Sequence, residues 1–369
     1  MLQRDAHVSP IALDATLWDE PTTGIALYTR ELHAGLTRIG VDAERWGARR
    51  TGDVPRGRTA RTLWTVSQLP KLLDERQPRL FHALSNFNLP LVKSSTPLVL
   101  TVHDLVPLLL PDTVSTPFRW QFRVWLSRSL AIADAVICVS ETAKQSVLRH
   151  FDVDARKLHV VHHGADHVDR VAPPDETTVK WLDSILPPEN KFVLYAGALD
   201  ARKNVQLVVR AMEALHDGGM PVPLVLAGQR WFGSGPIEAE FARVKLRGVD
   251  VRPLGYLSDS VFYALMKRAG VFVFPSRYEG FGLPPLEAMR LGVPTIISTE
   301  GSLPEVCGPG AAQVGPDDPR ALATLLSQWL TDSTERNKQS LRARTHALTY
   351  SWDETARQTA NVYQRIAPR

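Results

Sequence analysis

The sequence contains little cysteine, no long apolar stretch and no large excess of charge of either sign. Its two cysteines, Cys138 and Cys307, exclude a disulfide framework, and they do not have the spacing of a metal site. No stretch approaches the roughly 20 apolar residues that a membrane span needs. A formal net charge of +4 is too small for a nucleic-acid-binding protein, although it suits an anionic ligand. We therefore expect a cytoplasmic protein without nucleic-acid partners, whose contact with a membrane would be peripheral, at the inner face.

Two glycine-rich phosphate-binding motifs are also missing. Neither G-x-G-x-x-G nor G-x-x-x-x-G-K-[ST] occurs in the chain, which argues against a dinucleotide-dependent reductase. The string Asp152-Val153-Asp154 has the D-x-D form that binds metal in other transferases. It follows a helical pattern and precedes a turn, so we interpret it as structural and expect no metal.

Short apolar runs alternate with helical patterns along the whole chain. This alternation predicts an α/β protein built from parallel sheets, and the length of 369 residues suits two domains. The apolar runs that we expect to be strands are Ile11–Leu13, Leu80–Leu84, Leu98–Val102, Ala135–Val139, Leu158–Val161, Phe192–Ala196, Leu224–Ala227, Val251–Leu254, Val271–Phe274 and Thr295–Ile297.

A polar, proline-rich segment divides the two halves. We predict an N-terminal domain over residues 1–165, a linker with one short helix over 166–188, and a C-terminal domain over 189–350. Ligands of doubly wound sheets bind outside the carboxyl ends of the strands. The active site is therefore expected just after the strands, in a cleft between the two domains.

The segment 271–298 contains the strongest motif of the sequence. A strand is followed by the loop that holds Glu279, Gly280 and Gly282, and two prolines then suit the first turn of a helix that carries Glu287. Carboxylates accept hydrogen bonds from vicinal hydroxyls, so one acid can bind a sugar and the other a ribose. The alternative is that both are ordinary acids near a helix N-terminus, which the macrodipole favours.

Two basic residues follow the strand that ends near Gly197. Arg202 and Lys203 stand at the expected start of a helix, where cations oppose the macrodipole. A bound diphosphate would reverse that argument, because two cations and helix N–H groups would neutralise it. The alternative is a solvated Arg-Lys pair.

A histidine follows a strand of the first half. The run 98–105 ends in Val-His-Asp-Leu, which places His103 at the carboxyl end of its strand. An imidazole there can bond a sugar hydroxyl or handle a proton, and a structural role is the alternative.

Together these segments resemble the retaining GT-B glycosyltransferases, specifically glycosyltransferase family 4 (group 1), with a mannosyltransferase-like pattern. Glu279 and Glu287 match the E-x7-E signature of that family, Arg202-Lys203-Asn204 its basic segment, and Thr101–Leu105 its T-V-H-D-L segment. Matches of lower specificity continue to Tyr350–Ala356. The resemblance implies two Rossmann-like, doubly wound domains facing across a cleft, with a last helix in 351–369 that crosses back to the first domain.

The resemblance also implies a role for each candidate residue. Glu279 and His103 would lie beside the transferred sugar, Glu287 would bind the ribose, and Lys203 with Arg202 would contact the diphosphate. Backbone N–H groups of Phe281, Gly282 and Leu283 would contact the donor. The loop at Gly24 resembles the family's glycine loop near the donor.

The implied reaction is a metal-independent transfer of a hexose with retention of configuration. No cofactor is expected. The partners would be a nucleotide-sugar donor, with GDP-mannose favoured over a UDP-sugar, and a glycan or lipid-linked acceptor of polysaccharide biosynthesis, such as lipopolysaccharide. A non-catalytic nucleotide-sugar-binding protein, or a UDP-sugar-dependent transferase of a small molecule, remains an alternative.

Residues 117–130 combine arginines with aromatic residues in the pattern of a basic amphipathic helix. One interpretation is a helix whose aromatic face packs in the core. The other is a surface for a lipid-linked acceptor or an anionic membrane.

Overall fold

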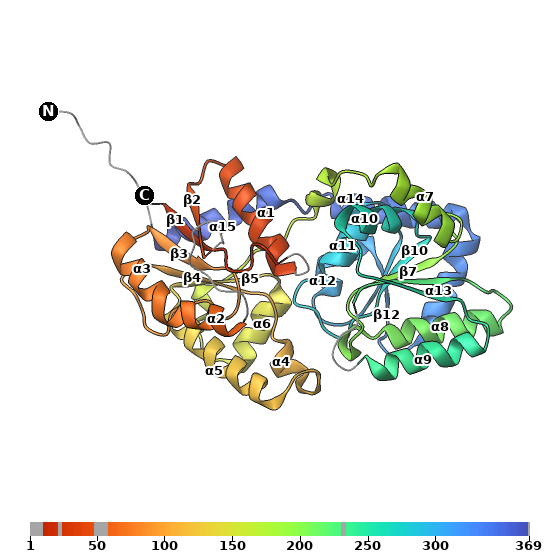
Figure 1. The fold of residues 1–369 in the computed structure, drawn as a ribbon, viewed down its shortest axis with the longest axis horizontal. Coiled ribbons are helices and arrows are strands. Elements are labelled where there is room, and N and C mark those ends of the chain that lie inside the picture. The colour runs from red at the N-terminus through yellow and green to blue at the C-terminus, as the bar shows by residue number, and fades with distance from the viewer. Residues whose placement is uncertain (1–9, 21–23, 48–57, 230–233, 368–369) are drawn as a thin grey trace. The chain divides into compact units, whose positions relative to one another are not determined.

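The computed structural model describes residues 10–20, 24–47, 58–229 and 234–367 (Figure 1). The chain divides into two compact units. Unit 1 comprises residues 1–164 together with 351–369, and unit 2 comprises residues 165–350.

Unit 1 contains a six-stranded parallel sheet in the order β2-β1-β3-β4-β5-β6. Apolar residues fill its central strands, as expected for a parallel sheet that is covered on both faces. The strands are β1 (Ile11–Asp14), β2 (Ala43–Trp46), β3 (Leu80–Ala83), β4 (Leu98–Val102), β5 (Ala135–Cys138) and β6 (Leu158–Val160). The helical segments are α1 (Gly24–Arg38), α2 (Arg58–Leu63), η2 (Trp64–Gln68), α3 (Leu69–Arg76), α4 (Val106–Leu109), η3 (Pro111–Thr113), α5 (Thr116–Ile132), α6 (Glu141–His150), η4 (Ala155–Lys157) and α15 (Trp352–Ile366).

Unit 2 contains a second six-stranded parallel sheet, in the order β12-β11-β10-β7-β8-β9. Figure 1 shows helices on both faces of each sheet. The strands are β7 (Val193–Ala196), β8 (Leu224–Ala227), β9 (Val251–Gly255), β10 (Val271–Phe274), β11 (Thr295–Ser298) and β12 (Ala312–Val314). The helical segments are η5 (Asp166–Arg170), α7 (Glu176–Ile185), η6 (Ala201–Lys203), α8 (Val205–Asp217), α9 (Gly235–Leu246), α10 (Asp259–Arg268), α11 (Leu283–Arg290), α12 (Leu303–Cys307), η7 (Gly308–Gly310), α13 (Pro319–Thr331) and α14 (Ser333–Ala347).

The prediction of two doubly wound α/β domains with parallel sheets is confirmed, and all ten expected strands are present. β2 and β12 were not among the expected strands. Both are edge strands with partly exposed residues, so neither shows the continuous apolar run of a buried strand. No helix within the described ranges is long and apolar enough to cross a membrane.

The last helix, α15, belongs to the core of unit 1. Trp352, Ala356 and Tyr363 are buried with residues of β1 and α1 in one apolar cluster. The polar segment after residue 164 contains the expected short helix, α7, and also the turn η5, where His167 and Val168 are buried.

Candidate functional site

Strand order brings two of the predicted segments together in unit 2. β7 and β10 are neighbours in the sheet, so the loops at their carboxyl ends lie side by side. The Arg277 N–H donates to the Arg202 carbonyl oxygen at 2.8 Å, and the Arg202 guanidinium donates to the Tyr278 carbonyl oxygen at 2.9 Å. The loop with Arg202 and the loop with Glu279 are thereby joined.

Glu279, Lys203 and Arg202 form one buried cluster of charges. Glu279 Oε1 lies 2.7 Å from Lys203 Nζ and 2.9 Å from an Arg202 guanidinium nitrogen. The exposed fractions of the three side chains are only 12%, 13% and 17%. The alternative of a solvated Arg-Lys pair is therefore excluded. Two cations that lie directly before the N-terminus of α8 are suited to bind a diphosphate.

Burial and charge compete in this cluster. Burial raises the pKa of Glu279, but the charges of Lys203 and Arg202 and the hydrogen bond of Lys203 outweigh it, so the pKa lies below its ordinary value. Burial and the Arg202 charge lower the pKa of Lys203, and the charges of Glu279 and Asp200 offset this only in part. An added anion would stabilise the charged form of Lys203, because the buried ammonium lacks full compensation.

The loop after β10 requires glycine at its end. Gly282 precedes α11 with φ +94°, and a Cβ there would lie 2.5 Å from Leu303 Cδ2. Pro284 and Pro285 have no N–H, so the backbone donors that the start of α11 can offer are the N–H groups of Gly282 and Leu283. The expected helix is confirmed, with the two prolines in its first turn.

A serine from the next loop fixes this segment. Ser302 Oγ lies 3.0 Å from the Glu279 carbonyl oxygen and 2.8 Å from that of Phe281. The Phe281 ring is buried against Tyr350, with ring centroids 6.4 Å apart. Phe281 therefore offers a ligand its backbone rather than its ring.

Glu287 is buried on α11, where two residues that the sequence analysis missed hold it. Its Oε1 lies 2.9 Å from His167 Nε2 and 3.2 Å from the Tyr263 hydroxyl. Its exposed fraction is 5%, so a favourable interaction with the helix macrodipole does not by itself explain this buried acid. His167 lies in a polar segment and Tyr263 on α10, and no motif in the sequence marks either residue.

His103 lies at the carboxyl end of β4 in unit 1, as its segment predicts. Its Nε2 is 2.8 Å from the Leu84 carbonyl oxygen, and its ring packs edge-on against Tyr28. Burial lowers the pKa of His103, although Leu84 and Asp104 act in the opposite direction. The imidazole is thus neutral at pH 7. Because a carbonyl oxygen only accepts, Nε2 carries the proton and Nδ1 is the acceptor.

Gly24 begins α1 in unit 1. A Cβ at this position would meet no atom within 4 Å, so packing gives no reason for glycine. The residues 21–23 of the same predicted loop lie outside the described residues. The donor-binding role of Gly24 stays a prediction.

The structure thus places seven of the nine predicted residues in unit 2, with Gly24 and His103 in unit 1. It joins Arg202, Lys203 and Glu279 directly. It places Glu287 on the helix that follows their loop, with partners of its own. The described residues include no group of three or more histidine, cysteine, aspartate or glutamate side chains that could hold a metal ion.

Two family models match the chain, one for each half. The model described as glycosyl transferases group 1 matches residues 182–346, and the model described as Glycosyltransferase Family 4 matches residues 22–169. All seven candidate residues of unit 2 lie in the first range, and both candidates of unit 1 lie in the second.

Similar proteins include two from Escherichia coli. O-antigen chain mannosyltransferase B is 30% identical over 269 residues, which are 73% of this chain and 70% of that protein. The serotype-specific mannosyltransferase WbdA is 30% identical over 73% of this chain, which corresponds to only 33% of its own length. Among solved structures, Anabaena HepE in complex with UDP-glucose shares the GT-B fold. Its TM-score is 0.72 at 18% identity, over 97% of this chain and all of that one.

Proposed function

This chain belongs to the glycosyltransferases of family 4 (group 1), and from that premise we propose a hexosyltransferase that uses a nucleotide diphosphate sugar. GDP-mannose is the favoured donor, because the relatives described above are mannosyltransferases. The acceptor is a glycan or a lipid-linked glycan of polysaccharide biosynthesis.

The observation that carries the proposal is the buried cluster of Lys203, Arg202 and Glu279. In the proposed reaction the acceptor oxygen forms a bond to the anomeric carbon, and the bond from that carbon to the diphosphate breaks. The acceptor proton goes to a diphosphate oxygen on the same face, which retains the configuration. Lys203, Arg202 and the N–H of Leu283 stabilise the charge that develops on the leaving group, so no metal is needed.

The remaining residues bind and orient the donor. Glu287 accepts hydrogen bonds from the ribose hydroxyls through Oε2, because His167 and Tyr263 occupy Oε1. Glu279 accepts from a sugar hydroxyl and at the same time keeps both cations in place. We assign His103 to sugar positioning through its Nδ1 lone pair.

A panel of donors tests this assignment by thermal shift. GDP-mannose, GDP and a set of UDP-sugars would be added to the protein and to Glu287→Ala. We expect GDP-mannose to raise the melting temperature of the protein most, and the Glu287→Ala variant to lose the effect. Equal stabilisation of the variant would contradict the ribose role. A larger response to UDP-glucose, the ligand of the Anabaena protein, would favour the UDP-sugar alternative.

Turnover separates the enzyme from a non-catalytic nucleotide-sugar-binding protein. We expect release of the nucleoside diphosphate in the presence of EDTA, and an α-linked product from an α-linked donor by NMR. The non-catalytic alternative would be supported if the donor binds but no nucleoside diphosphate is released, whether the sugar acceptor is water or a lipid-linked glycan. Loss of turnover in EDTA would contradict the metal-independent mechanism.

Helix α5 supports a membrane-side acceptor as part of this proposal. Phe122 and Leu126 pack in the core, whereas Trp120 and Val124 are 63% and 60% exposed. Arg123 and Arg128 lie on the exposed side of the helix. An exposed aromatic and basic surface suits an interface with anionic lipid. Sedimentation with vesicles that contain phosphatidylglycerol tests it, and Trp120→Ser should reduce binding relative to Trp181→Ser, another exposed tryptophan.

A further inference from the structure

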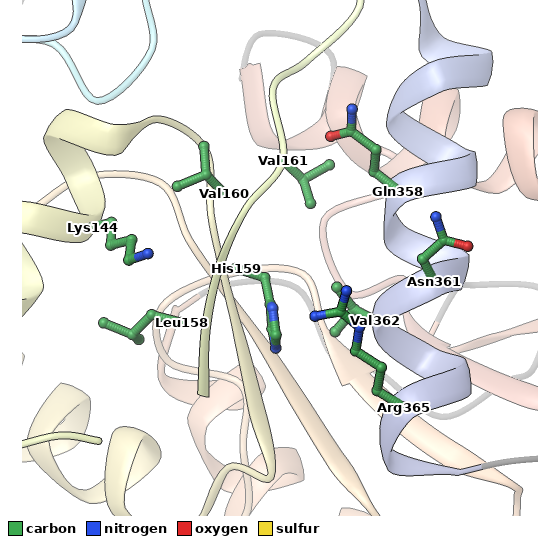
Figure 2. Close-up of a pocket in the computed structure, with 9 residues that line it drawn as sticks. All are labelled: Lys144, Leu158, His159, Val160, Val161, Gln358, Asn361, Val362 and Arg365. Atoms are coloured by element: carbon green, nitrogen blue, oxygen red, sulfur yellow. The ribbon is translucent and has the colours of Figure 1, made fainter. Parts of the chain in front are cut away.

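A cavity of about 470 Å³ opens along the edge of the sheet of unit 1 (Figure 2). Among the strands that the structure describes, β6 is the last of that sheet and pairs with β5 alone. Four consecutive residues, 158–161, line the cavity. Successive side chains of a strand point to opposite faces of the sheet, so a cavity lined by all four lies along the free edge of the strand.

Two helices flank this edge and contribute the basic side chains. α6 supplies Lys144, β6 supplies His159, and α15 supplies Arg365. Figure 2 shows Lys144 on one side of the strand and Arg365 on the other, with the His159 ring near Arg365. α15 also contributes the amides of Gln358 and Asn361, and Val161 and Val362 supply apolar surface.

The charge of the lining is of one sign. Among the residues that the structure describes, no aspartate or glutamate lines the cavity. Lys144 and Arg365 have no carboxylate of the described residues within ion-pair distance, whereas Arg357, also on α15, pairs with Glu354. The cavity therefore brings together three basic side chains, and no acidic side chain of the described residues lines it.

The electrostatics of His159 agree with this geometry. Burial lowers its pKa, and the charges of Arg365 and Lys144 lower it further. Both cations are thus near enough to act on the same imidazole. A ligand that carries negative charge would relieve this repulsion.

We propose that this edge cavity is a binding site for a small molecule that carries a phosphate or carboxylate group. Lys144, His159 and Arg365 bind the anionic group, the two amides bind its hydroxyls, and the valines pack against the remainder. The volume is typical of a small-molecule site. An added peptide strand is disfavoured, because β6 has only three residues to pair with.

Valine methyl NMR of the whole 369-residue chain reports binding at this cavity directly. Val160, Val161 and Val362 line the cavity, so their methyl signals, assigned by single Val→Ile variants, report binding there. Inorganic pyrophosphate and citrate serve as the phosphate and carboxylate probes. The titration uses the Lys203→Ala background, because pyrophosphate should also bind the basic cluster of unit 2.

We expect saturable shifts of these methyl signals with at least one probe below about 10 mM. Lys144→Ala and Arg365→Ala should each weaken binding about tenfold or more, since each removes one charge-assisted contact. Arg149→Ala is the matched control on α6 and should leave binding unchanged. The absence of saturable shifts with both probes, or equal affinity in the Lys144→Ala and Arg365→Ala variants, would overturn the proposal.

Discussion

The candidate residues of the two units differ in how they are stabilised. In unit 2, Lys203 and Arg202 lie with Glu279 in a largely buried cluster of charges, and Asp200 lies 3.8 Å from Arg202. In unit 1, His103 lies among aromatic rings and neutral hydrogen bonds, and burial keeps it uncharged. In the proposed function, the charges of unit 2 would bind a diphosphate, whereas unit 1 would offer neutral acceptors to sugar hydroxyls.

The largest expected effect comes from removing a cation of unit 2. Lys203→Ala should lower turnover about 10²- to 10³-fold, because one preorganised contact to the developing negative charge is lost. Release of the nucleoside diphosphate measures this. Lys191→Ala is the matched control, since Lys191 is exposed just before β7. Turnover within threefold of the unchanged protein would show that the basic cluster is not the diphosphate site.

Acidification should destabilise unit 1 more than unit 2. Burial lowers the pKa of His82 to about 3, and the pKa values of His103 and His163 are lowered by burial as well. Each histidine contributes stability that is present above its unfolded pKa of about 6.5 and is lost as the pH falls through its folded pKa. The pKa of Glu279 is lowered from 4.5, so its contribution is lost only at more acidic pH.

Between pH 6.5 and 4.5, unit 1 should therefore lose more stability than unit 2. Hydrogen exchange of peptides from each unit, compared at pH 7.5 and 5.0 after correction for the intrinsic rate, measures the difference. Equal loss of protection in both units would contradict this account. The unit 1 loss should become smaller in His82→Gln, which removes one of the buried histidines.

A smaller effect is expected at the carboxylate of α11. Tyr263→Phe removes one hydrogen bond to Glu287, which should weaken donor binding about two- to tenfold, because such a bond contributes about 0.5–1.5 kcal/mol. KM should rise while kcat changes little. The exposed Tyr256 provides the control variant Tyr256→Phe. A fall in kcat with unchanged KM would indicate that Glu287 acts in the chemical step and not in donor binding.

The smallest effect on folding is expected at Gly24. Gly24→Ala meets no atom within 4 Å, so the free energy of unfolding should change by less than about 1 kcal/mol. Weaker donor binding in a variant of unchanged melting temperature would indicate close approach of a ligand to this backbone. Unchanged binding would remove Gly24 from the site.

The fold could be predicted because most of its strands are continuous apolar runs in a buried sheet. β2 and β12 escaped prediction, since an edge strand needs no such run. The motif around Glu279 and Glu287 could be located because the local backbone requires Gly282 at the end of the loop and accepts the two prolines in the first turn of α11. The pairing of Glu279 with Lys203 could not be predicted, because it depends on β7 and β10 being neighbours in the sheet. Neither segment contains information about the strand order.

His167 shows where sequence reasoning reached its limit. It lies in a segment whose composition indicates a linker, yet its side chain is buried against Glu287, 120 residues later. A single histidine in a polar run gives no periodicity and no motif. Only the tertiary fold reveals that it orients an acid of the predicted site.

The return of α15 to unit 1 has a consequence for biosynthesis. Unit 2 is one uninterrupted segment, whereas the core of unit 1 requires Trp352 and Tyr363 beside β1 and α1. The chain leaves unit 1 after Gly164 and returns at Ser351. A Cβ at Gly164 would collide with the backbone of Trp352, so these two segments pack closely against each other. During translation, unit 2 can therefore reach its native state first. The core of unit 1 stays incomplete, with apolar surface accessible to chaperones, until α15 has emerged from the ribosome.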